Sequence, residues 1–213
     1  MKTHKTMKIV LALLLFAVSA FSAFSQDVQD ISPSNTPLRV SGTFDNILGQ
    51  NRTNKDMLAY VVIFQTLSNH ARVNFSQDDY ALPRMLAANS VQAIYDVDPE
   101  TASLDLATTI QARVVWVQYA DGTTWGDTTN DTVANLLRDR VGLRQFLEQV
   151  STATSMTVMS LLAQIQVDVQ QSQIARDMAA YYSRMSAADV MNDVSTRLAA
   201  VAAHNKMLRL KTP

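Results

Sequence analysis

The 213-residue chain contains no cysteine. A disulfide framework, a thiolate metal ligand, a cysteine nucleophile and a lipid on an N-terminal cysteine are therefore all excluded. Histidine is scarce too, because only His70 and His204 follow the first 25 residues. We expect each histidine to be exposed or paired within the fold. Since zinc sites draw on cysteine and histidine, we predict no such site and no other cofactor.

Charge of one sign does not dominate. The chain has 18 lysine and arginine residues against 19 aspartate and glutamate residues, a net charge of −1. It shows no basic cluster of the kind that binds nucleic acid. It also lacks a glycine-rich phosphate loop and a GxSxG nucleophile elbow. The sequence therefore predicts no nucleic-acid partner and contains no specific enzyme motif.

Glycine and proline are few, with five residues of each, and they are unevenly spread. Four of the glycines and four of the prolines lie between residues 33 and 126, whereas residues 127–212 contain only Gly142 and no proline. Because these residues mark turns, short elements are expected first and long ones later. We predict a β-sandwich domain at residues 38–126 and a helical region at residues 127–213.

The N-terminus has the order of a secretory signal peptide. Three lysines precede an apolar run in MKTHKTMKIVLALLLFAVSAFSAFSQD, and Ala23 and Ser25 suit the small positions before a cleavage site. We predict a signal peptide at residues 1–25, a flexible segment at residues 26–37 and export to the periplasm or the cell exterior. A membrane anchor is the alternative, but serines interrupt the run and spanning needs about 20 apolar residues. No second run of that length follows.

Residues 38–126 contain several apolar segments rich in β-branched and aromatic residues, which favour strands. The expected strands are PLRVSGTFDN, MLAYVVIFQTL, ARVNFSQ, SVQAIYDV and TIQARVVWVQYA. Segments with turn composition separate them, among them ILGQNRTNKD and SQDDYALP. This pattern is typical of an antiparallel sandwich. With the helical region behind it, the chain is predicted to be an α+β protein.

The same segments resemble small immunoglobulin-like β-sandwich modules of exported bacterial proteins. In such modules a strand like LAYVVIF is followed by an acidic turn like DDYALP, and the last strand ends in a phrase like ADGTTWG. The resemblance covers residues 38–126, and AANS stands where such modules often carry a glycine turn. It implies an immunoglobulin-like fold and an exported protein, and it carries no catalytic residues across.

Residues 127–213 are predicted to form about three helices, because their apolar residues recur at helical spacing. The first helix begins at a capping box made of Thr128 and Asp131, and Gly142 either kinks it or divides it. The last helix begins at Ser186, whose acidic partner stands three residues later.

Residues 156–185 allow two interpretations. Ile165, Val167 and Val169 alternate with polar residues as in a strand, yet the apolar residues also fall into two stripes at helical spacing. We predict a single helix of about 28 residues, roughly 42 Å long. One stripe consists of Val158, Leu162, Ile165 and Val169, and the other of Val167, Ile174, Met178, Tyr181 and Met185. Because one neighbouring helix cannot cover both, the second stripe is expected to pack on the sandwich or on a second copy of the chain.

The segment VVWVQYADGTTWGD, residues 114–127, is interpreted as a strand, a turn and a short return strand. Asp-Gly supplies the positive φ that a two-residue hairpin turn needs at both of its central positions. Strict alternation would place Val115 and Val117 on one face of the strand and Trp116 on the other. In this interpretation the tryptophans pack the sheet and its junction with the helices.

A second interpretation of that segment is functional. Asp121 and Asp127 would form a carboxylate pair beside the aromatic rings of Trp116 and Trp125, as in a glycan-binding cleft or a glycoside hydrolase. Such a hydrolase needs two carboxyl groups roughly 5 to 9 Å apart across a cleft. These four residues are the ligand platform predicted from the sequence.

Two other acidic segments could offer oxygen ligands to calcium. Asp96, Asp98 and Glu100 alternate in DVDPE, and Asp78 and Asp79 are adjacent. DVDPE lacks the glycine continuation of a dedicated calcium loop, and a solvated acidic turn is the alternative for both segments.

The predicted export and the absence of specific catalytic motifs favour a non-enzymatic binding or structural module. Its partner would be an unknown protein or glycan, and the helical region could join two copies of the chain. The alternative is a hydrolase that acts on glycans through carboxylates alone.

Overall fold

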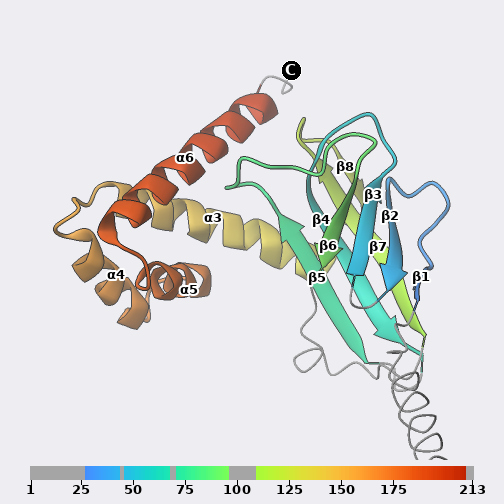
Figure 1. Ribbon diagram of the computed structural model, residues 1–213, viewed down its shortest axis with the longest axis horizontal. Helices are drawn as coiled ribbons and strands as arrows, with labels where there is room; N and C mark the ends of the chain where they lie inside the picture. Colours follow the sequence, from blue (N-terminus) through green and yellow to red (C-terminus); the bar gives the residue numbers. More distant parts are fainter. Residues whose placement is uncertain (1–26, 44–45, 68–70, 96–108, 210–213) are drawn as a thin grey trace, which may run out of the picture.

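The computed structural model describes residues 27–43, 46–67, 71–95 and 109–209. The strands gather on one side of the molecule and the helices on the other, and the long helix α3 (Asp131–Ser151) reaches from one group to the other (Figure 1). The predicted signal peptide, His70 and the acidic residues of DVDPE lie outside the described residues. The α+β class and the helical C-terminal region are confirmed.

The strands form two sheets. The five-stranded sheet contains β1 (Val28–Asp30), β4 (Met57–Thr66), β5 (Arg72–Asp78), β7 (Ile110–Tyr119) and β8 (Thr124–Gly126). The three-stranded sheet contains β2 (Leu38–Thr43), β3 (Asn46–Asn51) and β6 (Val91–Tyr95). Their orders are β1-β7-β4-β5, with β8 also paired to β7, and β2-β3-β6. The pairing of β1 with β7 is parallel and the others are antiparallel, so the sandwich is mixed rather than purely antiparallel.

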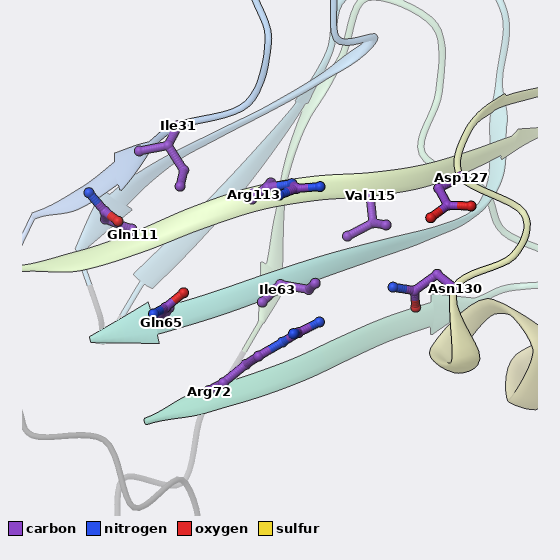
Figure 2. A pocket seen from close by; sticks show the side chains of 9 residues that line it. All are labelled: Ile31, Ile63, Gln65, Arg72, Gln111, Arg113, Val115, Asp127 and Asn130. Atoms are coloured by element: carbon purple, nitrogen blue, oxygen red, sulfur yellow. The ribbon is translucent and has the colours of Figure 1, made fainter. Parts of the chain in front are cut away.

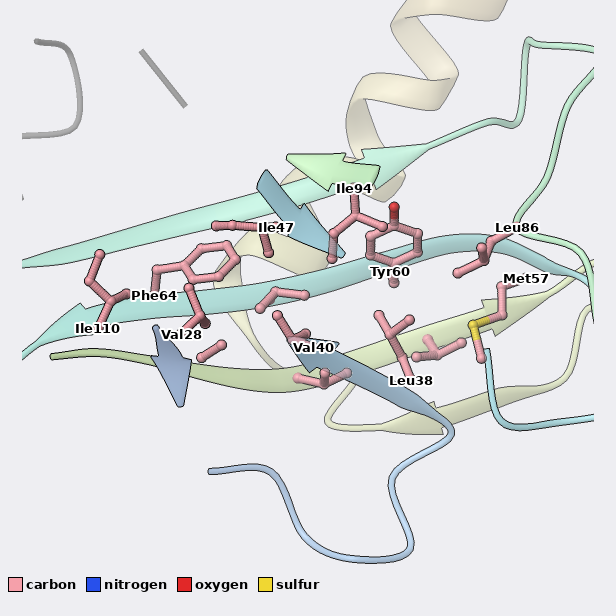
Figure 3. Close-up of a cluster of buried hydrophobic side chains, with 14 of the residues drawn as sticks. Val28, Leu38, Val40, Ile47, Met57, Tyr60, Phe64, Leu86, Ile94 and Ile110 are labelled. Atoms are coloured by element: carbon pink, nitrogen blue, oxygen red, sulfur yellow. The ribbon is translucent and has the colours of Figure 1, made fainter. Parts of the chain in front are cut away.

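The inner faces of the two sheets enclose an apolar core (Figure 3). Its buried side chains include Leu38, Val40, Ile47, Met57, Tyr60, Phe64, Leu86, Ile94, Ile110 and Val117. In β4, Tyr60 and Val62 belong to this core, whereas Ala59 and Val61 belong to a second cluster beneath α3. A strand covered on both faces needs apolar residues at nearly every position, which explains the apolar run of β4.

Two strands lie where the sequence predicts none. β1 falls in the segment expected to be flexible, and β3 falls largely in ILGQNRTNKD, which has turn composition. β3 is the central strand of its sheet and ends at the fully buried Asn51. The Asn51 amide donates to the carbonyl oxygens of Lys55 and Leu86 at 2.8 and 3.1 Å. A polar side chain here satisfies buried backbone groups, so its presence does not end the sheet.

Four helices, not three, follow the sandwich in the described part of the chain. They are α3 (Asp131–Ser151), α4 (Val158–Val167), α5 (Gln173–Tyr182) and α6 (Ala187–Arg209). α3 is continuous through Gly142, and its N-cap is Asn130 instead of Thr128, because the Asn130 side chain accepts a hydrogen bond from a first-turn amide. The predicted start of α6 is confirmed, since the Ser186 hydroxyl accepts from the Asp189 amide. None of the helices in the described ranges is long and apolar enough to cross a membrane.

The prediction of a single helix over residues 156–185 is wrong. α4 ends at Asp168, whose backbone is extended and whose side chain accepts a hydrogen bond from the Gln170 amide. α5 then starts at Ser172, which caps it by accepting from the Ala175 amide. Short polar side chains that bond to nearby amides compete with helix continuation, and two of them divide this segment.

The two predicted apolar stripes are only partly buried. The first is buried except for Val169, which is 81 % exposed. In the second, Val167 and Tyr181 are exposed, whereas Met178 packs against the helical core and Ile174 lies beside α3. The fully buried face of α5 consists instead of Ala175, Ala179 and Tyr182. Small alanine side chains let α5 approach its neighbours closely and give little apolar signal in the sequence.

The segment that follows β5 joins the sandwich to the helices. Asp78 accepts two hydrogen bonds from Arg140 of α3. The Tyr80 ring stacks on that of His204 in α6, and His204 Nδ1 lies 2.7 Å from the Tyr80 carbonyl oxygen. Burial raises the pKa of Asp79, although hydrogen bonds from neighbouring side chains oppose the shift. Asp78 is therefore part of the junction, and Asp79 is buried beside it and bonded to Gln77 and Arg84, so the pair does not form a solvated turn.

Candidate functional site

The two tryptophans of the predicted ligand platform lie on opposite faces of the five-stranded sheet. Trp116 is 1 % exposed and packs beneath α3 with Val133 and Leu136. Trp125 pairs across the hairpin with Val117 and packs against the core between the sheets. The two indole rings therefore cannot present one surface to a ligand.

A β-bulge accounts for the position of Val115. The register between β4 and β7 shifts in the middle of β4. Val115 and Trp116 both belong to the cluster beneath α3, while Val114 and Val117 both belong to the inner core. An extra residue in one strand of an antiparallel pair disrupts alternation, and this is why Val115 does not share a face with Val117 as the sequence predicts.

The two carboxylates of the platform are held at opposite ends of β8. Asp121 lies before this strand, where Lys55 Nζ is 2.9 Å from its Oδ2 and Thr123 donates to its Oδ1. Asp127 lies after the strand and accepts from the amide and hydroxyl of Thr129 at 2.8 and 2.6 Å. Within the described ranges, His, Asp and Glu side chains form no group of three or more that could hold a metal ion.

The hairpin turn has three residues instead of the predicted two. The Gly122 amide donates to the Tyr119 carbonyl oxygen, and the Tyr119 amide donates to the Thr123 carbonyl oxygen, both at 2.9 Å. Gly122 has a φ of 85°, whereas Asp121 does not have a positive φ. Three-residue hairpin loops commonly combine a type I turn with one left-handed residue, so only the glycine needs its conformational freedom.

Asp127 borders a hollow of about 200 Å³ on the outer face of the five-stranded sheet, which we call the arginine pocket (Figure 2). Its lining residues are Ile31, Ile63, Gln65, Arg72, Gln111, Arg113, Val115, Asp127 and Asn130. They come from β4, β5 and β7 and from the segments that follow β1 and β8. α3 covers the adjoining part of the same face, and its N-cap Asn130 forms one end of the pocket.

The register of the sheet sets the spacing of the two arginines. Ile63 of β4 pairs with Arg113 of β7, and Gln65 of β4 pairs with Arg72 of β5. Neighbouring strands lie about 4.8 Å apart and each residue advances a strand by about 3.4 Å, so the two arginine backbones, on either side of β4 and two residues out of step, are roughly 12 Å apart. Both side chains extend along the sheet in the same direction (Figure 2). A small ligand above Ile63 can therefore meet one guanidinium on each side.

The arginine pocket is electrostatically positive. Arg72 Nε donates to Asn74 Oδ1 at 3.1 Å, and neither Arg72 nor Arg113 forms an ion pair with a described residue. The one carboxylate in the lining is Asp127. Hydrogen bonds from Thr129 lower its pKa, and Arg113 adds to this effect. At neutral pH the described lining thus carries two positive charges and one negative charge.

These groups can bind an oxyanion. A guanidinium presents a rigid fork of N–H donors that matches carboxylate and phosphate groups. The side chains of Gln65 and Gln111 supply further amide donors. Ile63 and Val115 provide an apolar floor for the carbon atoms of a ligand.

Only part of the arginine pocket could be predicted from the sequence. Gln111 and Arg113 alternate with apolar residues at the start of TIQARVVWVQYA, which indicates a strand whose outer face is exposed there. Arg72 belongs to another strand, and only the pairing register brings it near. The chain matches no family model, no curated protein and no solved structure. The function must therefore be inferred from the site itself.

Proposed function

We propose that the protein is an exported, non-enzymatic binding module whose arginine pocket holds a carboxylate or phosphate group of a small molecule. The observation that carries this proposal is the position of Arg72 and Arg113 on the two strands that flank β4, opposite Gln65 and Ile63 respectively, without an ion-pair partner among the described residues. Arginine can hold either oxyanion through two parallel hydrogen bonds, which gives geometric selectivity as well as affinity.

The lining of the pocket suits binding better than catalysis. Its described part contains no serine, cysteine, histidine or lysine that could act as a nucleophile. Its carboxylate, Asp127, has a lowered pKa because of the Thr129 hydrogen bonds. A general acid at neutral pH needs a raised pKa instead, so Asp127 is poorly suited to proton donation.

The strand order supports an immunoglobulin-like sandwich as the scaffold. The chain crosses between the sheets after β1, after β3, after β5 and after β6. The orders β2-β3-β6 and β8-β7-β4-β5 correspond to strands A-B-E and G-F-C-C′ of sandwiches in this class. An experimental structure with a different strand order would refute this part of the proposal.

Calorimetric titration tests the binding function. The purified protein is titrated at low ionic strength with inorganic phosphate and, separately, with succinate. We expect at least one of them to bind, and we expect Arg72→Gln and Arg113→Gln each to weaken binding by about 1 kcal/mol, roughly fivefold. This figure is below the usual value for a hydrogen bond to a charged group, because both arginines are exposed and solvent screens them.

A matched control separates the pocket from general surface charge. Arg39 is an exposed arginine of β2, in the other sheet, and does not line the pocket. Arg39→Gln removes the same charge and is expected to leave anion affinity unchanged. Equal losses of anion affinity in Arg39→Gln and Arg113→Gln would show that the attraction is non-specific and would contradict the proposal. The proposal would also fail if neither anion bound the wild-type protein.

Export rests on the lysines, apolar run and small residues of the N-terminal segment. The full-length chain is expressed in a bacterium, and the product is isolated from the periplasm or the medium. N-terminal sequencing is expected to begin at Gln26. A product that stays in the cytoplasm with residues 1–25 attached would contradict export.

A further inference from the structure

A second hollow, of about 230 Å³, lies at one end of the sandwich. It is bordered by the segment before β2, the loop after β3 and the ends of β7 and β8. Its lining includes Asn35, Thr36, Arg52, Thr53, Tyr119 and Trp125. We call it the aromatic pocket, because the half-buried Trp125 and the largely buried Tyr119 line a site that is otherwise mainly polar. None of its lining residues belongs to the arginine pocket.

We propose that the aromatic pocket binds a neutral carbohydrate. A pyranose ring has faces made of C–H bonds and a rim of hydroxyl groups. Such a ligand needs an aromatic surface for its face and short polar groups for its rim, and an indole or phenol ring offers a large apolar surface with a polar edge. Trp125 packs partly against the core between the sheets and is otherwise available to the pocket.

The buried hydroxyl of Thr36 points independently to a ligand with hydrogen-bonding groups. Thr36 is 4 % exposed, and its Oγ1 has no hydrogen-bond partner among the described residues. An unsatisfied buried hydroxyl is unfavourable, and native proteins contain few of them. Thr36 lines the pocket. A hydroxyl can both donate and accept, so a sugar hydroxyl that comes within hydrogen-bond distance of Oγ1 would satisfy it whichever role it takes.

The loops around the aromatic pocket are fixed to one another. The Arg52 amide donates to the Pro37 carbonyl oxygen at 2.8 Å, and Arg52 Nη1 donates to the Ser34 carbonyl oxygen at 3.2 Å. These bonds join the loop after β3 to the segment before β2. A preformed site avoids the entropic cost of ordering loops when the ligand binds.

Two cationic side chains lie at the pocket: Lys55, which has an ion-pair partner, and the lining residue Arg52, which donates to the Ser34 carbonyl oxygen. Lys55 pairs with Asp121 at 2.9 Å, and its ammonium group lies 5.3 Å from the centre of the Tyr119 ring. The positive charge of Lys55 is thus neutralised and placed against an aromatic ring, while Arg52 has no ion-pair partner among the described residues. The aromatic pocket therefore has one guanidinium without such a partner, whereas the arginine pocket has two.

Tryptophan fluorescence tests this inference, because the chain contains only two tryptophans. The purified protein is titrated with glucose, mannose, galactose, N-acetylglucosamine, cellobiose and chitobiose. We expect at least one sugar to change the emission saturably. The change should vanish in Trp125→Phe and persist in Trp116→Phe, since Trp116 is buried beneath α3. Absence of a response to every sugar, or a response that survives in Trp125→Phe, overturns the proposal.

Thr36→Val separates a ligand-binding role from a structural one. Valine has nearly the shape of threonine and removes an unsatisfied hydroxyl, so thermal stability should stay the same or rise. Affinity for the sugar that binds the wild type should fall by roughly three- to tenfold, the value of one neutral hydrogen bond. An unchanged affinity of Thr36→Val for that sugar would show that the Thr36 hydroxyl does not bind the ligand. Arg113→Gln should leave sugar binding intact, so this inference and the oxyanion proposal fail or succeed separately.

Discussion

The guanidinium of Arg140 holds the carboxylate of Asp78 through two hydrogen bonds, Nε to Oδ2 at 2.7 Å and Nη2 to Oδ1 at 2.8 Å. Its remaining nitrogen, Nη1, donates to Gln118 Oε1 at 2.6 Å. The guanidinium also lies 5.0 Å from the centre of the Tyr80 ring. One side chain of α3 thereby contacts β5, β7 and the segment after β5. This contact holds the helical region against the sandwich.

Replacing Arg140 by methionine should destabilise the whole protein. The Arg140 side chain is 9 % exposed and that of Asp78 is 24 % exposed, so removal of one partner leaves a poorly solvated charge. We expect a loss of about 3 kcal/mol in the free energy of unfolding, measured by urea denaturation. Arg144→Met is the control, because Arg144 pairs with Glu148 at the exposed surface of the same helix. Arg144→Met should lower the free energy of unfolding by less than about 1 kcal/mol. Equal losses in Arg140→Met and Arg144→Met would show that the contact between Arg140 and Asp78 has no special role.

Gly142→Ala should destabilise the contact between α3 and α5. A Cβ at this position would lie 2.6 Å from Ser172 Oγ and 2.8 Å from Ile174 Cγ2. The better helix propensity of alanine gains up to about 1 kcal/mol, but overpacking costs about 1 to 3 kcal/mol. We expect a net loss in the free energy of unfolding. Gly142→Ala should have a smaller effect when Ser172 is also replaced by alanine. A stability gain in both backgrounds would show that the helices are not in close contact here.

The hydrogen bond from Tyr182 to Asp193 should make stability depend on pH. Burial alone would raise the pKa of Asp193, but hydrogen bonds from Tyr182 and Arg197 outweigh it, and the pKa is lowered below 3.8. The stabilisation is therefore complete above pH 3.8 and is lost as the pH falls through the folded-state pKa. Tyr182→Phe should cost about 1 kcal/mol at pH 7 and progressively less in acid. Denaturation curves of the wild type and of Tyr182→Phe at several pH values measure this dependence. A stability difference between the two proteins that grows in acid would contradict it.

Asp127→Asn should strengthen oxyanion binding in the arginine pocket. The asparagine oxygen can still accept the hydrogen bonds from Thr129, but the negative charge that faces the pocket is lost. We expect phosphate affinity to rise roughly two- to fivefold at low ionic strength and the gain to shrink at higher salt, because the carboxylate is exposed and screened. Calorimetry at two salt concentrations measures this effect. No change at low salt would place the bound anion away from Asp127.

Composition and short-range signals were sufficient for the α+β division and for the start of α6. Four glycines and four prolines lie in residues 33–126 and almost none follow, and this change lies close to the last strand, β8, which ends at Gly126. Ser186 caps α6 because its side chain needs only a neighbour three residues away. Information of this kind is local, so it can be read from the sequence.

Features that depend on distant residues were not predictable. Asn51 lies in a buried strand because carbonyl oxygens of two other segments satisfy its amide. The division of residues 156–185 follows from caps at Asp168 and Ser172 that compete with a continuous apolar pattern. The arginine pocket requires Arg72 and Arg113 to approach each other across β4, and a bulge in the same sheet places Val115 outside the inner core. Strand register determines these positions.

Nuclear magnetic resonance of the arginine side chains tests the proposed oxyanion site most directly. The Nε–Hε signals of 15N-labelled protein are followed at low ionic strength while inorganic phosphate or succinate is added. The account predicts that the signals of Arg72 and Arg113 shift together with one dissociation constant, while those of Arg39 and the buried Arg140 stay in place. Stationary signals from Arg72 and Arg113 with both anions, or equal shifts of all exposed arginines, would contradict it.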